Sequence, residues 1–175
     1  GVISEDECVR ADVTAERLAR LPAAFAELGA AGADQLQLAK FSELGSIEHV
    51  HTMGNSPAMC DAGALVLLGD AALGESLGIA PTARLVTSTT ASGEPLEVVS
   101  GCVTVTEALL LDQSLRARDI DLFEINEAFA SQAVYCVRTL GIDPERVNPN
   151  GGAIALGHPL GCTGAKLTAT LLHEM

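Results

Sequence analysis

The amino-acid sequence predicts a layered α/β domain, with helices packed on the faces of a mainly parallel sheet. Short apolar or β-branched runs occur at residues 64–68, 83–89 and 120–125, and stretches with helical apolar spacing alternate with them. Strands that alternate with helices along a chain are joined by crossovers within one sheet. Hydrophobic residues make up 48% of the 175 residues and charged residues 19%, with a mean hydropathy of +0.31, which favours a folded chain over a disordered one.

The first 50 residues predict a helical surface segment followed by a less regular excursion. Apolar residues recur at helical spacing over residues 18–28, after two candidate N-caps, Asp12 and Thr14. The glycine-rich residues 29–32 interrupt this pattern. Residues 34–50 have weak periodicity, so they predict an irregular excursion or a short helix.

The middle of the chain predicts a central strand and the first crossover. Residues 64–68, Ala-Leu-Val-Leu-Leu, are wholly apolar and precede Gly69 and Asp70, as in a strand that is covered on both faces. A helix over residues 71–77 follows. The β-branched residues 83–89 then predict a second strand.

The remaining elements are three helices and one strand. Apolar spacing between residues 105 and 115 predicts a helix, and residues 120–125 predict a third short strand. A helix over residues 126–140 should end at Gly141, and a final helix should span residues 165–175. The chain starts without an initiator methionine and stops on an apolar helical pattern, so both ends are expected to be cut.

Charge and cysteine usage exclude several kinds of partner. A formal net charge of −13 and a pI near 4.5 disfavour nucleic acid and anionic membranes, although a few local cations can still hold an anionic ligand. No apolar run is long enough to cross a bilayer, and no signal-peptide pattern opens the chain. The five cysteines form no CxxC pair, and no metal site is expected. A soluble protein of the reducing cytoplasm fits these features.

The residues with most chemistry lie in a glycine-rich segment, residues 148–166, with the sequence NPNGGAIALGHPLGCTGAK. Its glycines allow close approach of a ligand to the backbone, and Pro159 restricts the backbone of His158. A histidine held in this way suits general-base work or hydrogen bonding to an oxyanion. The alternative is a glycine-rich turn with an incidental histidine, and the residues alone leave both possibilities open.

This segment resembles the thiolase signature NxxGGAIAxGHPxGxxGA, and residues 121–130, DLFEINEAFA, resemble the family's NEAFA motif. Residues 47–64 look like the segment that enters the first strand of the C-terminal thiolase domain. The resemblance implies an incomplete thiolase-like fold. Residues 1–50 would then form the end of the loop domain and a connecting segment, and residues 51–175 most of a C-terminal βαβαβα half-domain, truncated before its last strands.

The resemblance also implies roles for particular residues. In thiolases a cysteine nucleophile takes the acyl group from acyl-CoA. His158 would activate that cysteine and polarise the thioester oxygen, and Asn126 would hold a water that completes the oxyanion site. The alternative for Asn126 is a helix N-cap. Gly157, Ser56 and Phe129 are expected to bind substrate. Glu127 and Phe129 are also expected to act as supports, Glu127 through a hydrogen bond near the site and Phe129 by packing in the core.

Departures from the family pattern limit what the chain is expected to do alone. No cysteine has the sequence context of the nucleophile, and the terminal segment that carries the second catalytic cysteine is absent. Cys162 is expected to be helix-starting structure and not a substitute. Pro57 stands where many thiolases have a serine that contacts the pantetheine arm, and residues 98–104 lack the expected Gly-Pro pair.

These features predict acyl-CoA C-acyltransferase chemistry of fatty-acid metabolism, by acetyl transfer to or thiolytic cleavage of 3-ketoacyl-CoA. The substrates would be acyl-CoA and CoA, with no further cofactor. The chain would act within a longer enzyme or an assembly, either as a homo-oligomer or with a complementing N-terminal half, and would be inactive by itself. The alternative is a non-catalytic thiolase-like subunit with a structural or partner-binding role.

Overall fold

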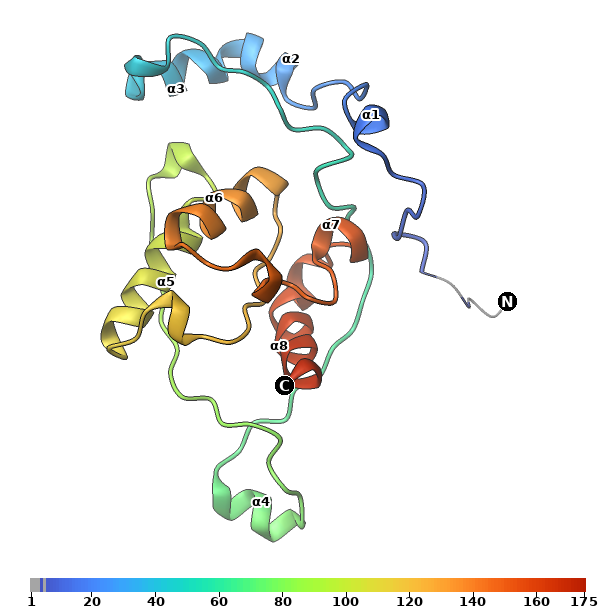
Figure 1. Cartoon of the computed structure of the whole chain (residues 1–175), viewed down its shortest axis with the longest axis vertical. Helices are drawn as coiled ribbons and strands as arrows, with labels where there is room; N and C mark the ends of the chain where they lie inside the picture. Colours follow the sequence, from blue (N-terminus) through green and yellow to red (C-terminus); the bar gives the residue numbers. More distant parts are fainter. Residues whose placement is uncertain (1–3, 5) are drawn as a thin grey trace.

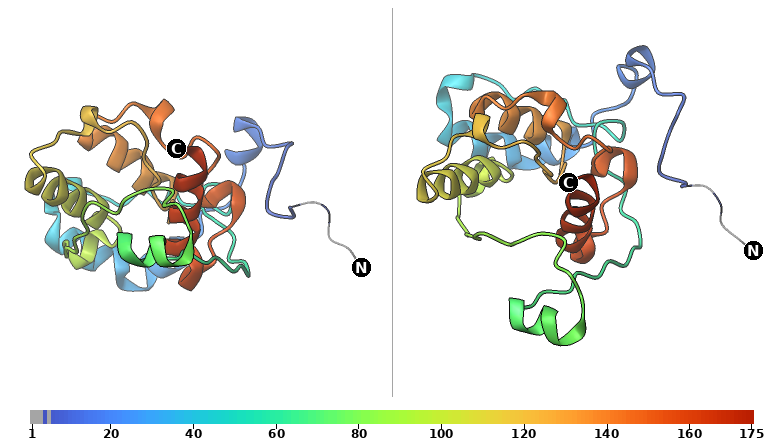
Figure 2. Two further views of the ribbon diagram at one scale, coloured as in Figure 1. Left: turned by 90° about the horizontal axis from the view of Figure 1, so that it is seen from below. Right: turned by 60° about the horizontal axis from the view of Figure 1, so that its bottom comes forward.

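The computed structural model describes residue 4 and residues 6–175. Figure 1 shows α1–α3 along an arc at one end of the molecule, α5–α8 in the middle and α4 at the opposite end. The right view of Figure 2 shows α4 standing away from the other helices on two irregular segments. The helices are α1 (Ala15–Leu18), α2 (Ala26–Leu28), α3 (Asp34–Lys40), α4 (Ala71–Leu77), α5 (Gly101–Asp112), α6 (Ala130–Leu140), α7 (Ala153–Leu156) and α8 (Thr163–Glu174), with single turns η1 (Gly29–Ala33), η2 (Ser42–Leu44), η3 (Pro95–Glu97), η4 (Ala117–Asp119), η5 (Pro144–Arg146) and η6 (Leu160–Cys162).

The N-terminal helical segment is divided where the sequence predicts one helix over residues 18–28. Thr14 caps α1 by accepting a hydrogen bond from the Arg17 N–H at 3.3 Å, and the chain leaves the helix before Pro22. Proline lacks an N–H and disfavours helical backbone at the residue before it, so the prediction is wrong across this break. A π turn then joins α2 to α3 and contains a kink at Gly32, and α3 is the short helix expected after it.

Residues next to the helix ends account for most of the limits of the other predicted helices. In α4, which matches the predicted residues 71–77, the Asp70 side chain accepts from the Leu73 N–H at 2.8 Å and Gly78 ends the helix in the left-handed conformation. Gly141 ends α6 as predicted, but α6 begins at Ala130 and not at residue 126. The final helix is confirmed as α8, from Thr163 to Glu174.

The predicted strands are not formed as ladders. Among the described residues, pairing is limited to two isolated parallel bridges, Met59 with His158 and Phe123 with Val147. Residues 64–68 and 83–89 lie outside any helix or ladder, and Leu65 is 93% exposed. A strand needs hydrogen-bonded neighbours, and an apolar strand also needs cover on both faces. The described residues supply neither, so the βαβαβα arrangement is not confirmed here.

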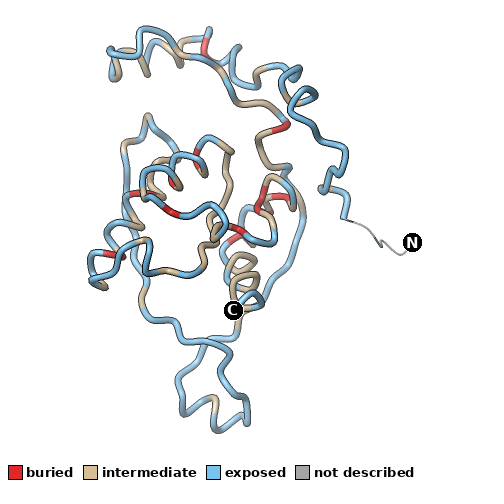
Figure 3. The backbone as a smooth tube through the Cα atoms, viewed as in Figure 1, coloured by how far each residue is buried: buried red, intermediate tan, exposed pale blue. Residues whose placement is uncertain are grey.

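The buried core lies mainly between α5 and α6. Val103 and Leu110 of α5 and Cys136 of α6 are buried, and Ile142 is buried just beyond α6. Figure 3 shows the few buried positions scattered among intermediate and exposed ones. Most large apolar side chains of residues 62–92 therefore remain in contact with water.

We expect these exposed segments to make the isolated chain associate with itself. Unpaired extended backbone with apolar side chains is a template for edge-to-edge pairing. Light scattering should show a mass that rises with concentration, and Leu65→Glu combined with Leu67→Glu should lower it, because charge opposes such pairing. Leu111→Glu is the control, because that side chain is 81% exposed on α5 and lies outside the segment. A concentration-independent monomer would contradict the expectation.

Candidate active site

His158 is fixed at two points on the loop between α7 and η6. Its backbone N–H donates to the Ala58 carbonyl at 2.8 Å, and its Nδ1 lies 2.8 Å from the Thr163 hydroxyl at the start of α8. The imidazole Nε2 makes no hydrogen bond within residues 6–175. The ring is therefore held through one nitrogen and leaves the other available to an incoming group.

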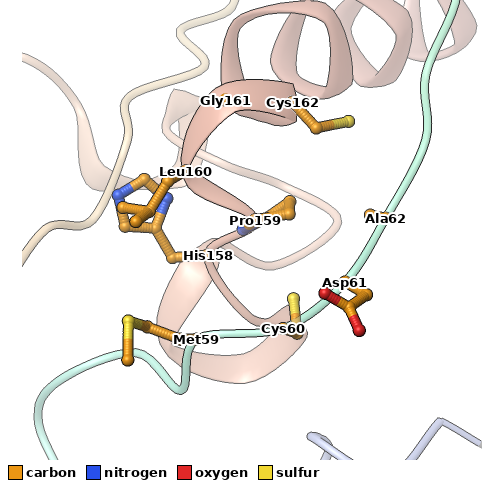
Figure 4. A pocket seen from close by; sticks show the side chains of 9 residues that line it. All are labelled: Met59, Cys60, Asp61, Ala62, His158, Pro159, Leu160, Gly161 and Cys162. Atoms are coloured by element: carbon orange, nitrogen blue, oxygen red, sulfur yellow. The ribbon is translucent and has the colours of Figure 1, made fainter.

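His158 lines an open hollow of about 300 Å³ (Figure 4). One wall comes from residues 59–62, the segment that follows the Ala58 contact, and the other from the loop that leads into α8. Lys166 of α8 also holds this loop, because its Nζ donates to the Gly157 carbonyl at 2.9 Å. The lining residues are Met59, Cys60, Asp61, Ala62, His158, Pro159, Leu160, Gly161 and Cys162.

The loop that carries Asn126 is tied to the same glycine-rich segment. The Asn148 side chain accepts from the Ile125 N–H at 2.8 Å and donates to the Ile125 carbonyl at 2.9 Å. Glu127 extends this tie, since its carboxylate accepts from the Asn148 side chain at 3.2 Å and from the Ile154 N–H at 2.9 Å. The two motifs noted in the sequence therefore form one connected unit, with Glu127 in the supporting role expected of it.

Asn126 and Ser56 have buried polar atoms without partners. The Asn126 Oδ1 and the Ser56 Oγ have no hydrogen-bond partner in the described part of the chain. Asn55, next to Ser56, accepts the Ala130 N–H at 3.0 Å, so residues 55–58 link the start of α6 to His158. Phe129 is the N-cap residue of α6, so the N-cap alternative for Asn126 is wrong.

Phe129 lies in an aromatic cluster of Phe25, His51 and Phe129. Its ring centroid is 4.8 Å from that of His51 and 5.8 Å from that of Phe25, in edge-to-face arrangements. The His51 Nε2 is 2.7 Å from the Ser131 hydroxyl, which fastens the cluster to α6. Phe129 packs against these two rings but is only partly buried and lies outside the buried core, and its substrate-binding role stays a prediction.

Sequence reasoning missed the residues that position His158 and Asn126. Asn148, Thr163 and Lys166 all lie inside the glycine-rich segment, but no local pattern assigns them partners. The one available signal is Asn148 itself, which adopts a φ of 48° and is buried. Asparagine tolerates this left-handed region better than most residues, so an asparagine ahead of the paired glycines favours such a turn.

Glu124 is a buried carboxylate beside this site. Neither of its oxygens has a hydrogen-bond partner among residues 6–175. Burial raises the pKa of Glu124, Lys166 opposes that rise, and Glu127 and Glu174 add to it. The folded state therefore binds more protons between the unfolded and folded pKa values, and stability falls as pH rises through this interval.

We expect Glu124→Gln to stabilise the chain at pH 7, because the neutral amide avoids the cost of burying a charged carboxylate. The gain should be about 0.5–1 kcal/mol, a value discounted for partial solvent shielding of the carboxylate. It should disappear below the unfolded pKa, where the wild-type carboxyl is already neutral. Denaturant unfolding at both pH values measures the effect, with the exposed Asp121→Asn as control. Equal changes in the free energy of unfolding at the two pH values would show that the charge on Glu124 does not destabilise the folded chain.

Comparison with known proteins identifies the family. A family model described as "Thiolase, C-terminal domain" matches residues 79–175. The chain is 45% identical over 175 residues to the 3-ketoacyl-CoA thiolase of Bacillus subtilis, covering 99% of this chain and 39% of that relative. It superposes on the crystal structure of the Bacillus anthracis acetyl-CoA acetyltransferase with a TM-score of 0.81 and 34% identity, covering 99% of this chain and 39% of that one. For the dimeric peroxisomal thiolase of Saccharomyces cerevisiae the TM-score is 0.78 and the identity 35%, with the same coverage.

The fold and the paired motifs thus define a thiolase-type domain. The chain belongs to the thiolase family, and its residues 79–175 correspond to that family's C-terminal domain. It spans 39% of the length of the Bacillus subtilis relative. In the described residues, no helix is long and apolar enough to cross a membrane.

Proposed function

We propose that this chain supplies the His158 and Asn126 side of a thiolase active site, which transfers acyl groups between CoA thioesters. The reaction class is acetyl transfer to, or thiolytic cleavage of, 3-ketoacyl-CoA. Relatives named as 3-ketoacyl-CoA thiolase and acetyl-CoA acetyltransferase support this class. Acyl-CoA and CoA are the substrates, and no further cofactor is assigned.

The observation that carries the proposal is the fixed His158 ring with its unpartnered Nε2. A cysteine thiol placed at Nε2 would lose its proton to the imidazole, and the thiolate would attack the carbonyl carbon of the thioester. The C–S bond to CoA then breaks, and the imidazolium returns the proton to the departing CoA thiolate. His158 therefore acts as base and then as acid within one acyl transfer.

Asn126 suits the stabilisation of the oxygen that becomes negative in this step. Its buried Oδ1 lacks a partner among the described residues and can accept a hydrogen bond from a water. That water retains a second hydrogen to donate to the thioester oxygen, and a donor aimed at developing charge lowers the barrier. Ser56, Gly157 and Phe129 are assigned to the substrate contacts around it.

The acyl-carrying cysteine is assigned to a different polypeptide segment. None of the five cysteines has the nucleophile's sequence context, so the proposed site needs a complementing thiolase N-terminal half. We also infer that residues 64–68 and 83–89 become strands of the βαβαβα layer when such a segment pairs with them. Domain division at about residue 50, a homo-oligomer and a cytoplasmic location belong to the same proposal.

Complementation tests the function. The isolated chain should show no thiolysis of a 3-ketoacyl-CoA, because His158 and Asn126 assist a thiolate but cannot carry an acyl group. Adding the N-terminal region and the terminal glycine-rich segment of the Bacillus subtilis relative should give steady CoA-dependent turnover. Turnover by the isolated chain that is lost on Cys162→Ala would overturn the proposal. An assembled complex without turnover would favour a non-catalytic subunit.

A further inference from the structure

Two cysteines from distant parts of the sequence meet against the backbone of Gly157. A Cβ placed on Gly157 would lie 2.5 Å from the Cys60 sulfur and 3.3 Å from the Cys8 sulfur. Both sulfurs therefore lie beside a single point on the loop that leads to His158. Gly157 has a φ of 90° and no side chain, so both thiols can approach its backbone closely.

We propose that Cys8 and Cys60 form a redox-sensitive dithiol, a modification site for two-electron oxidants of the peroxide class. Both cysteines are free and half-buried. Cys60 also lines the hollow of His158, so the pair lies at the edge of the candidate active site. The linkage itself is independent of the proposed acyl-transfer function.

The chemistry balances with a peroxide as oxidant. One thiolate attacks a peroxide oxygen and breaks the O–O bond, which gives a sulfenic acid and hydroxide. The second thiolate attacks that sulfur, an S–S bond forms, and the sulfenic oxygen leaves as hydroxide. Two thiols lose two electrons and two protons, and the peroxide becomes two molecules of water. A thiol reductant reverses the linkage.

A second pair provides an internal comparison. Cys102 of α5 lies beside Cys136 of α6, and burial together with this neighbour raises the pKa of Cys136 to about 12. At pH 8 only about one Cys136 in ten thousand would be a thiolate, so this pair should react slowly. Burial also raises the pKa of Cys60, and Cys8 adds to that rise, whereas Lys166 opposes it. Proximity alone would predict oxidation of both cysteine pairs. The burial and the raised pKa of Cys136 disfavour its pair and so favour oxidation of Cys8 with Cys60.

Trypsin separates all five cysteines, which makes the test direct. Cleavage after lysine and arginine places Cys8 in residues 1–10, Cys60 in 41–84, Cys102 in 85–116, Cys136 in 119–138 and Cys162 in 147–166. The whole chain is treated with stoichiometric hydrogen peroxide at pH 8, alkylated and digested. The linked peptide 1–10/41–84 should exceed every other linked pair by roughly tenfold and disappear on reduction. Cys8→Ser should abolish it, and Cys102→Ser should leave it unchanged.

Phenylarsine oxide provides a second measurement without oxidation, because trivalent arsenic bridges two neighbouring thiols. The chain should bind it with one-to-one stoichiometry at Cys8 and Cys60, and Cys8→Ser should remove that binding. Cys8 lies outside any helix and is only partly buried, so Cys8→Ser should leave the fold of the chain unchanged. A dominant Cys102–Cys136 link, or oxidation of Cys60 as a single thiol, would overturn the proposal.

Discussion

His158→Ala in the complemented assembly is expected to lower kcat for 3-ketoacyl-CoA thiolysis by about a thousandfold or more. The variant removes the base that ionises the nucleophilic thiol before it attacks the C3 carbonyl. It also removes the base that takes the proton from the CoA thiol when CoA attacks the acyl-enzyme. KM should change much less, since His158 presents only one nitrogen to the substrate side. Initial rates over a range of CoA concentrations measure the two effects separately.

Thr163→Val is the matched variant for this experiment. It removes the hydroxyl 2.8 Å from the His158 Nδ1 but keeps the branched shape at the start of α8. We expect a loss of about tenfold in kcat, because the ring loses the contact that orients it. Equal activity of His158→Ala and the unmodified chain would show that another base operates and would remove the basis of the proposed mechanism.

The sequence predicted those helices whose ends are set by neighbouring residues. The limits of α4 follow from Asp70 and Gly78, which act within one turn of the helix they cap. The predicted start of α6 is too early, because the residues on either side of 126–129 bond to distant parts of the chain. The Asn148 side chain bonds both backbone groups of Ile125, and the Asn55 carbonyl accepts the Ala130 N–H. Such long-range partners leave no periodic signal in the segment itself.

The predicted strands, unlike these helices, depend on partners outside their own segment of sequence. Residues 64–68 have the composition of a buried strand, and that composition describes the surroundings they require. Extended backbone is stabilised by neighbours that pair with it, and the described residues provide only isolated bridges. The apolar pattern therefore predicts a requirement for pairing partners, and it contains no information on where those partners come from.

For the candidate site, the motifs located His158 and Asn126 but not the contacts that hold them. Lys166 is bonded to the Gly157 carbonyl through a side chain that the sequence presents as one more exposed cation of a helix. Glu127 was expected near the site, yet its bond to the Ile154 N–H depends on how the two loops meet. The identity of a functional residue is a local property, whereas its positioning depends on the three-dimensional contacts of the whole site.

Gly152→Ala is expected to separate the two motifs, because a Cβ at this position has no room. It would lie 2.1 Å from the Glu127 carboxyl carbon and 2.3 Å from each of its oxygens. Glu127 would have to withdraw and lose its bonds to Asn148 and Ile154, which leaves the Ile154 N–H without this partner. We expect a loss of about 2–3 kcal/mol in the free energy of unfolding and a fall in assembly turnover of at least about tenfold.

Gly164→Ala is the matched control, since it makes the same chemical change within the same motif. Apart from the adjacent residues and the backbone of the same helix, no atom lies within 4 Å of the added Cβ. Gly164 is inside α8, where alanine favours the helix by roughly 0.5–1 kcal/mol. The two variants should therefore change stability in opposite directions, as measured by denaturant unfolding followed by circular dichroism. If Gly152→Ala were as stable as Gly164→Ala, the lack of a side chain at Gly152 would not be needed to make room for Glu127. The Glu127 contact would then not hold the Asn126 loop to the His158 segment.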